Sequence, residues 1–289
     1  MRIGITGSTG KLGSHLVSMG CIGLALDVTE SKFDTGLDPG KDVIINCAAK
    51  TNVDKCETDK NYYWEAVEIN GNGAINLSEN FRGKIIHIST DYVFGGKRGP
   101  YSEDYLFDNH EDDLPARDMA YAITKFLGEL NVKSRQNVHI VRTTGLYGGA
   151  SPKHDFLNMI LDSYYISDFP EIPVTKELRG NQTYIPHLAE GLLELADRLS
   201  NPHSTYPKIL HIASREVISR YEFALMIADV YGLDKERLKP VKNSQVPGWV
   251  AARPKKGGLK VRLAEKLGIP IYSILEGLEE AHKNELQRK

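Results

Sequence analysis

Tyr121 and Lys125 lie four positions apart in a segment, roughly residues 117–135, whose pattern predicts an α-helix. At this spacing two side chains share one face of a helix. An ammonium group favours the phenolate form, so we expect Lys125 to lower the pKa of the Tyr121 hydroxyl. A tyrosine of this kind can donate a proton to a developing alkoxide or remove one from an alcohol. An isolated pair is more often an ordinary surface pair, so the prediction of catalysis depends on the segments upstream.

A glycine-rich turn lies near the amino terminus. Residues 7–13 read Gly-Ser-Thr-Gly-Lys-Leu-Gly, between a predicted strand at 2–6 and a predicted helix that ends near Met19. Glycines permit the tight turn, and the amides at the start of the helix attract an anion such as a pyrophosphate. A second strand at 22–27 ends at Asp27, about 20 positions after Gly7, where a carboxylate is expected to contact a ribose. These residues predict a βαβ unit that binds a dinucleotide.

The connection that follows Asp27 is short. The next predicted strand begins at residue 42, and a crossover helix with its loops needs about ten to twelve residues. A short strand predicted at 32–34 uses most of the room, so we expect the helix to be missing or reduced. Asp34 is a candidate for a contact with adenine, and a solvated turn residue is an equally good interpretation.

Two further strand ends carry candidate site residues. Cys47, Ala48 and Ala49 follow the strand at 42–46, and their small side chains let a ligand approach the backbone. Ser89 and Thr90 end another buried strand. Ligands of open α/β sheets bind outside the carboxyl ends of the strands. The Thr90 hydroxyl is therefore a candidate donor to a carbonyl oxygen.

The order of elements predicts an α/β fold with a doubly wound parallel sheet of the Rossmann type. Further predicted elements are a helix at about 62–81, in which Asn70 faces the sheet, and a strand at 138–142. Residues 97–118 are predicted to form a loop over the site. We expect a dinucleotide-binding domain at 1–149. Residues 150–289 are expected to be mostly a smaller α/β substrate-binding cap, from which some segments return to the Rossmann domain.

Composition excludes several other classes of protein. The net charge is −2, from 36 Lys and Arg against 38 Asp and Glu, which does not indicate a nucleic-acid or membrane surface. The apolar runs are shorter than a transmembrane helix needs, and the start of the chain does not resemble a signal peptide. The three cysteines have no metal-like spacing. We therefore expect a cytoplasmic protein with reduced thiols and no metal site.

Four segments together resemble the extended short-chain dehydrogenase/reductase superfamily: Thr6-Gly-Ser-Thr-Gly-Lys-Leu-Gly13, Asn46-Cys-Ala-Ala49, Ser89-Thr90, and Tyr121-x-x-x-Lys125 followed by Gly128-Glu129. Two segments are more specific. Ser89-Thr-Asp-Tyr-Val-Phe94 and Val53-Asp-Lys-Cys-Glu57 closely resemble the dTDP-4-dehydrorhamnose reductases. The resemblance covers residues 1–150 well and the remainder loosely.

The resemblance implies an NAD(P)H-dependent reduction of the C4 keto group of a nucleotide-linked 4-keto-6-deoxy sugar, on the way to a rhamnosyl donor. Thr90 would bond the keto oxygen, Tyr121 would protonate it, and Lys125 would hold the nicotinamide ribose. The implied cofactor contacts are Gly7, Thr9, Gly10, Lys11, Leu12, Gly13, Asp27, Asp34, Cys47, Ala48, Ala49, Tyr121 and Lys125. The implied substrate contacts are Thr90, Asp91, Tyr92, Tyr121, Phe156 and Arg179.

Several alternatives remain open at this stage. Asp27 favours NADH over NADPH, whereas Lys11 and Lys32 could offset its charge. The family stretch D-Q-x-G-x-P-T is replaced by Glu177-Leu-Arg-Gly-Asn-Gln-Thr183, which leaves the nucleotide base undecided. Within this stretch Arg179 is either a contact for the substrate diphosphate, since its guanidinium matches phosphate geometry, or a surface residue.

Two other functions compete with the simple reductase. A bifunctional 3,5-epimerase/4-reductase would need a base, and Asp91 stands where related enzymes carry a cysteine. A non-catalytic regulatory subunit, like that of methionine adenosyltransferase, would not need Thr90, Tyr121 and Lys125 together. The helices at about 62–81 and 117–135 often pair subunits in this superfamily, so a homodimer is also expected.

Overall fold

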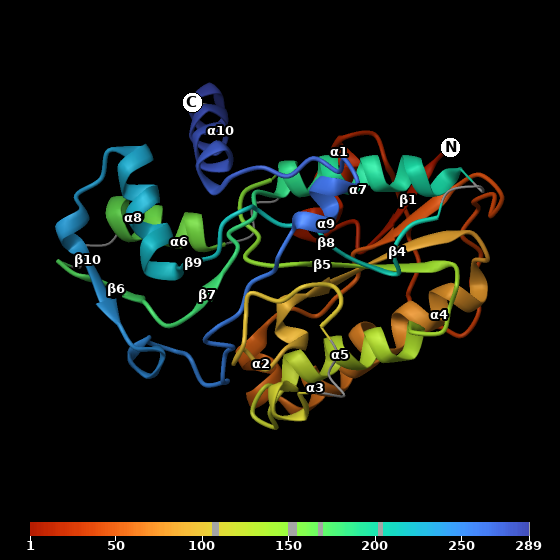
Figure 1. Cartoon of the computed structure of the whole chain (residues 1–289), viewed down its shortest axis with the longest axis horizontal. Coiled ribbons are helices and arrows are strands. Elements are labelled where there is room, and N and C mark those ends of the chain that lie inside the picture. Colours follow the sequence, from red (N-terminus) through yellow and green to blue (C-terminus); the bar gives the residue numbers. More distant parts are fainter. Residues whose placement is uncertain (106–109, 150–154, 167–169, 202–204, 289) are drawn as a thin grey trace.

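A six-stranded parallel sheet forms the centre of the larger lobe (Figure 1), in the order β2-β1-β3-β4-β5-β8. The computed structural model describes residues 1–105, 110–149, 155–166, 170–201 and 205–288. The sheet strands are β1 (Ile3–Thr6), β2 (Ile22–Gly23), β3 (Val43–Asn46), β4 (Lys84–Thr90), β5 (Val138–Thr143) and β8 (Ile209–His211). The predicted doubly wound sheet is confirmed. Its carboxyl edge, where β1, β3 and β4 end, carries the candidate site residues.

Helices cover both faces of this sheet (Figure 1). On one face α1, α7 and α9 pack on β1 and β3 around Leu16, Ile45 and Leu192, which are fully buried. On the other face α4 and α5 pack around Ile44 and Leu77. The helices of this lobe are α1 (Lys11–Ser18), α2 (Val53–Thr58), α3 (Lys60–Ala66), α4 (Gly73–Asn80), α5 (Ala120–Val132), α7 (Ile185–Ser200) and α9 (Arg262–Lys266). Because strands buried on both faces need few polar positions, β3 is apolar up to its last residue, Asn46, and β4 carries Ile85, Ile86 and Ile88 in its middle.

The stretch between β2 and β3 contains no helix, as expected. The strand predicted at 32–34 is wrong, and β2 stops at Gly23 rather than Asp27. Side chains of α4 hold this irregular stretch instead. The Asn80 side chain accepts a hydrogen bond from Phe33 N at 3.2 Å, and Asn76 Nδ2 donates to Val28 O at 3.0 Å. These bonds satisfy backbone groups that a strand would have paired.

The helix expected at 62–81 is interrupted by a π-helical turn, η1 (Val67–Asn72), between α3 and α4. Asn70 is fully buried there. Its Oδ1 accepts from Lys50 N, and its Nδ2 donates to Lys50 O and to Thr124 Oγ1, each at 2.9 Å. A Cβ on Gly128 would overlap the carbonyl oxygen of Asn70, so glycine lets α5 approach η1 closely. This contact places α5, with Tyr121, against the loop that follows β3.

The smaller lobe is built mostly from the carboxyl-terminal half (Figure 1). It contains α6 (Phe156–Tyr165), α8 (Arg220–Tyr231), α10 (Ile274–Arg288), a parallel pair of β6 (Ile172–Thr175) with β10 (Leu238–Val241), and an antiparallel pair of β7 (Arg179–Gly180) with β9 (Ile218–Ser219). Phe223, Leu157 and Leu278 are buried in its core. The predicted boundary at 149/150 stays a prediction. Within the second half, α7, β8 and α9 pack in the larger lobe.

Two features are absent from the described part of the chain. No helix there is long and apolar enough to cross a membrane. No group of His, Cys, Asp or Glu side chains in these residues is arranged to hold a metal ion.

Candidate active site

A cavity of about 530 Å³ lies where the two lobes meet. Its walls come from the start of α1, from the ends of β3, β4 and β5, from α5, and from α6, β7 and α8 of the smaller lobe. Its lining includes these predicted site residues: Gly10, Lys11, Leu12, Gly13, Cys47, Ala49, Thr90, Asp91, Tyr92, Tyr121, Lys125, Phe156 and Arg179. The structure therefore brings the predicted substrate residues and most of the predicted cofactor residues around one space.

The glycine-rich turn has the shape that a pyrophosphate requires. Gly7 has a φ of 62°, and a Cβ there would lie 2.6 Å from Ala48 N, so the turn packs tightly on the residues after β3. Gly10 is the N-cap of α1 and forms no side-chain cap, which leaves amides at the start of the helix free for an anion. These residues fit a dinucleotide.

Five predicted cofactor residues do not line the cavity: Gly7, Thr9, Asp27, Asp34 and Ala48. Gly7 and Ala48 lie directly behind its wall, in contact with each other. Asp27 is exposed, and its Oδ1 accepts from Thr29 N at 2.9 Å and from Thr29 Oγ1, which lowers its pKa. Asp34 closes a similar local turn with Gly36 N. The strand ends before Asp27, so the structure places both carboxylates in surface turns.

Tyr121 presents an unbonded phenol to the cavity. Its side chain is 9% exposed, and among the described residues its hydroxyl has no hydrogen-bond partner. The Tyr92 ring packs edge-on against it, with ring centres 5.8 Å apart. Burial raises the pKa of Tyr121 above its usual range, and the neighbouring Tyr92 and Asp91 raise it further. The prediction of a lowered pKa for Tyr121 is therefore wrong, because burial and these neighbours raise it.

Lys125 points from the same helix toward the end of β4. Its Nζ donates to Ile88 O at 2.8 Å. Burial lowers its pKa to about 8. The two side chains line the same cavity, as their spacing on α5 predicts. Both the phenol and the ammonium group are therefore within one enclosed site.

Thr90 and Asp91 line the cavity at the end of β4. Thr90 Oγ1 donates weakly to Asp91 Oδ1 at 3.4 Å and accepts from Tyr92 N at 3.3 Å. Asp91 Oδ2 accepts from Gly258 N at 3.0 Å. Burial raises the pKa of Asp91, while its hydrogen bonds with Thr144, Gly258 and Thr90 oppose that shift. Both carboxylate oxygens of Asp91 are thus engaged in holding the loop after β4.

A buried ion pair between Arg142 and Glu129 lies beside the end of β4. Arg142 of β5 bonds both oxygens of Glu129, with its Nε at 2.9 Å and its Nη2 at 2.6 Å. Ser89 Oγ also donates to Glu129 Oε1 at 2.5 Å. All three side chains are nearly inaccessible. The Gly128-Glu129 pair that accompanies the Tyr/Lys motif therefore joins α5 to the strand that carries Thr90.

The two arginines of the substrate side differ in what they contact. Arg179, the predicted diphosphate contact, lines the cavity, but its Nη1 bonds Glu222 at 3.1 Å and its Nη2 bonds Val217 O at 3.2 Å. Arg220 also lines the cavity and stacks 4.5 Å above the ring of Phe156. Within the described residues the Arg220 guanidinium has no hydrogen-bond partner. Arg220 was not predicted as a site residue, because its only distinguishing feature is its position as the first residue of α8.

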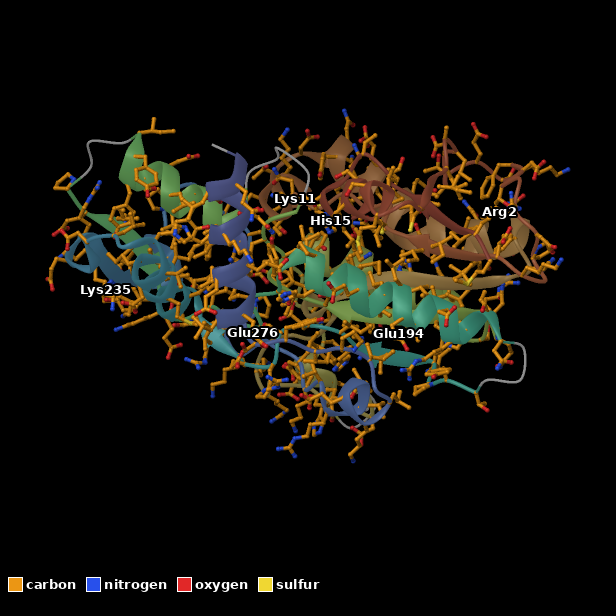
Figure 2. All side chains as sticks on the ribbon, turned by 90° about the horizontal axis from the view of Figure 1, so that it is seen from above. Arg2, Lys11, His15, Glu194, Lys235 and Glu276 are labelled. Atoms are coloured by element: carbon orange, nitrogen blue, oxygen red, sulfur yellow. The ribbon has the colours of Figure 1, made fainter. Side chains whose placement is uncertain are left out.

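Lys11 connects the glycine-rich turn to the smaller lobe. Its Nζ lies 2.7 Å from Asp155 Oδ2, and Figure 2 shows Lys11 at the boundary between the lobes. Asp155 also accepts from Gly148 N and from Asn158 N, and the second bond caps α6. Asp155 was not predicted. The prediction for Lys11 named the cofactor alone.

The fold and this site together define a class: a Rossmann-type α/β protein with a dinucleotide turn and a Tyr/Lys pair facing one cavity, as in the extended short-chain dehydrogenases/reductases. More narrowly, the chain belongs to the family described as the RmlD substrate binding domain, whose model matches residues 1–286.

Named relatives agree with this family. The dTDP-4-dehydrorhamnose reductase of Mycobacterium tuberculosis (strain CDC 1551 / Oshkosh) is 32% identical over 259 residues, 85% of this chain and 81% of the relative. The crystal structure of a dTDP-4-dehydrorhamnose reductase from Clostridium acetobutylicum has a TM-score of 0.82 at 29% identity and covers 100% of both chains. The Bacillus anthracis dTDP-4-dehydrorhamnose reductase, in complex with NADP, has a TM-score of 0.81 at 28% identity, covering 98% of this chain and 99% of the other.

Proposed function

We propose that this chain reduces the C4 keto group of a dTDP-linked 4-keto-6-deoxy sugar to an alcohol with NADPH or NADH, as a dTDP-4-dehydrorhamnose reductase. The observation that carries the proposal is the unbonded Tyr121 phenol, which faces the same cavity as Thr90, Lys125 and the glycine-rich turn. The relatives named above support the reaction, and the structure with NADP supports the cofactor.

Thr90, Tyr121 and Lys125 each have a separate role in this reaction. Thr90 donates a hydrogen bond to the keto oxygen and orients it. Tyr121 donates its proton to that oxygen, so that the carbonyl becomes a hydroxyl. Its raised pKa keeps the phenol protonated at neutral pH, as the reductive direction requires. Lys125 holds the ribose of the cofactor and stabilises the phenolate that remains after proton transfer.

The dinucleotide would be held by the start of α1, with Gly10, Lys11, Leu12 and Gly13 at its pyrophosphate, and by Cys47 and Ala49 on the other side. When bound, it supplies the hydride to the keto carbon. Asp27 and Asp34 are not part of this proposal, because both close exposed local turns. Because local bonds hold both carboxylates in these turns, we expect neither to repel a 2′-phosphate and both NADPH and NADH to be accepted.

Arg220 replaces Arg179 as our candidate for the substrate diphosphate. Its guanidinium is free on the cavity side, is held flat by Phe156, and matches the geometry of a phosphate. Burial lowers the pKa of Arg220, with Asp91 and Asp155 opposing the shift. An anionic diphosphate would complete the pairing of this buried cation.

The test is NADPH and NADH oxidation with dTDP- and UDP-4-keto-6-deoxyglucose, each with and without a separate 3,5-epimerase. Turnover of the dTDP sugar only with the epimerase is the expected result. Turnover without it, with rhamnose as product, would establish the bifunctional alternative. Dinucleotide binding without any turnover would favour the regulatory subunit. Gel filtration of the same preparation tests the homodimer.

A further inference from the structure

Helix α2 carries the Val53-Asp-Lys-Cys-Glu57 motif, to which the reaction above gives no role. It is a short helix whose first turn is capped by Asn52, since Lys55 N donates to Asn52 Oδ1 at 2.9 Å. Cys56 is 3% exposed and packs in one apolar cluster with Ala120 and Tyr121. The helix therefore lies directly against the first turn of α5 (Figure 1).

Glu57 bonds the catalytic helix one residue before the tyrosine. Its Oε2 accepts from Ala120 N at 3.0 Å. The N-cap residue of α5, Met119, contributes no side-chain bond, so Glu57 supplies the cap from another element. A carboxylate at this end also complements the positive end of the helix dipole. The position of the first turn, and so of Tyr121, depends on this contact.

Asp54 bonds a distant segment of the chain. Its Oδ1 accepts from Val250 N at 2.8 Å and from Ala251 N at 3.0 Å, and its carboxylate pairs with both terminal nitrogens of Arg253. The Arg253 guanidinium lies 3.9 Å above the ring of Trp249. One side chain thus holds two backbone amides and one buried cation of the 249–253 segment.

The same segment continues to the wall of the cavity. Gly258 N donates to Asp91 Oδ2, and Lys256 N donates to Gly96 O at 2.8 Å. Asp91 in turn accepts from the Thr90 hydroxyl. Residues 249–258 therefore run from α2 to the loop that carries Thr90.

We propose that α2 positions the two sides of the catalytic site relative to each other: Glu57 holds the helix of Tyr121, and Asp54 holds the 249–258 segment that supports Thr90. Both are positioning residues, because neither lines the cavity. This inference rests on the proposed reductase function.

The kinetic test compares Glu57→Ala, Glu57→Gln and Asp59→Ala with the wild-type chain. We expect Glu57→Ala to lower kcat about tenfold with little change in KM, because a small misplacement of Tyr121 slows the chemistry more than binding. Glu57→Gln keeps an oxygen acceptor and is expected to restore most of kcat. Asp59 caps α3 through Asn61 N and Tyr62 N, so Asp59→Ala removes a neighbouring cap without touching α5.

Asp54 is tested with Arg253→Ala in a double-mutant cycle. We expect each single variant to raise KM for the nucleotide sugar, and the effects to be less than additive in the double variant, since both single variants remove the Asp54–Arg253 pair. An unchanged kcat in Glu57→Ala, an equal loss in Asp59→Ala, or additive effects of Asp54→Ala and Arg253→Ala would overturn the proposal.

A readout independent of activity uses tryptophan fluorescence. The chain has two tryptophans, and Trp64→Phe leaves Trp249 as the reporter of the segment. We expect Asp54→Ala to shift Trp249 emission to longer wavelength and to increase quenching by acrylamide, whereas Asp59→Ala changes neither. If the wild-type chain reduces no nucleotide sugar, the proposed function fails, while unchanged Trp249 emission in Asp54→Ala would refute the α2 inference separately.

Discussion

At the scale of single residues, the site depends on which polar groups are left without partners. The Tyr121 hydroxyl and the Arg220 guanidinium both face the cavity and form no hydrogen bond with the described residues. Arg179 and Asp91, in contrast, are engaged by Glu222 and by Gly258. A group that is already bonded must break that contact to act on a ligand, so the free groups are the better candidates.

Tyr121→Phe is expected to lower kcat by about 10²–10⁴-fold, since it removes the proton donor. Because the hydroxyl has no partner in the described protein, the melting temperature should stay close to that of the wild type. Steady-state NADPH oxidation and a thermal melt measure the two effects. A variant that kept most of its kcat would show that another group donates the proton.

Arg220→Gln is expected to raise KM for the dTDP sugar by about 10–100-fold, the loss of one or two charge-assisted hydrogen bonds. The matched control is Arg179→Gln, which removes a contact to Glu222 rather than a free cation. Substrate titrations at saturating NADPH compare the two. Equal increases in KM would indicate that both arginines contact the diphosphate.

At the scale of elements, one aspartate joins the starts of two neighbouring strands of the sheet. Asp42 accepts from Arg2 N at 2.7 Å, from Arg2 Nε at 2.9 Å and from Asp38 N at 2.9 Å. These bonds lower the pKa of Asp42 to about 2 against the burial that opposes them. They join the start of β1 to the start of β3, and these two strands pair in parallel.

A carboxylate whose folded pKa is lowered stabilises the fold above its unfolded pKa, and the contribution is lost as the pH falls through the folded pKa. Asp42→Asn is therefore expected to lower the free energy of unfolding by about 1–2 kcal/mol at pH 7. The difference from the wild type should shrink between about pH 4 and pH 2. Urea unfolding at pH 7, 5 and 3 measures this. Asp34→Asn, in an exposed turn, serves as the control, and a difference independent of pH would contradict the assignment.

At the scale of the whole molecule, the cavity exists only because two lobes meet. Lys11 and Asp155 pair across that junction, with their side chains 18% and 3% exposed. The pair joins the cofactor turn to the N-cap of α6, beside the Phe156 ring on which Arg220 stacks. Both ligand sites therefore share one contact between the lobes.

Asp155→Ala is expected to weaken this junction as well as the α6 cap. The cap alone is worth about 1 kcal/mol, and the lost inter-lobe pair should add an increase in KM for the sugar. Asp234→Ala removes a cap inside the smaller lobe, where Glu236 N is the partner, and should leave KM unchanged. Urea unfolding measures the loss of stability in both variants, and substrate titration measures their KM values. Equal KM values for the two would show that the pair is structural only.

Much of the nucleotide-binding lobe could be predicted from the sequence because its signals are local. The glycine spacing at 7–13, the apolar strands and the i, i+4 spacing of Tyr121 and Lys125 each specify a short piece of backbone, and each piece places its side chains without reference to the rest. The absence of a helix after β2 followed from chain length in the same way.

Properties set by distant segments could be decided only by the tertiary structure. Burial, together with the neighbouring Tyr92 and Asp91, raises the pKa of Tyr121, opposite to the direction expected from Lys125. A strand that ends at Gly23 leaves Asp27 in a surface turn. Arg179 is hydrogen-bonded to Glu222, whereas Arg220 stacks on the Phe156 ring and faces the cavity. Local spacing determines which way a side chain leaves its own element, but burial and partners depend on residues far away in the chain, and these decide which groups remain free to react.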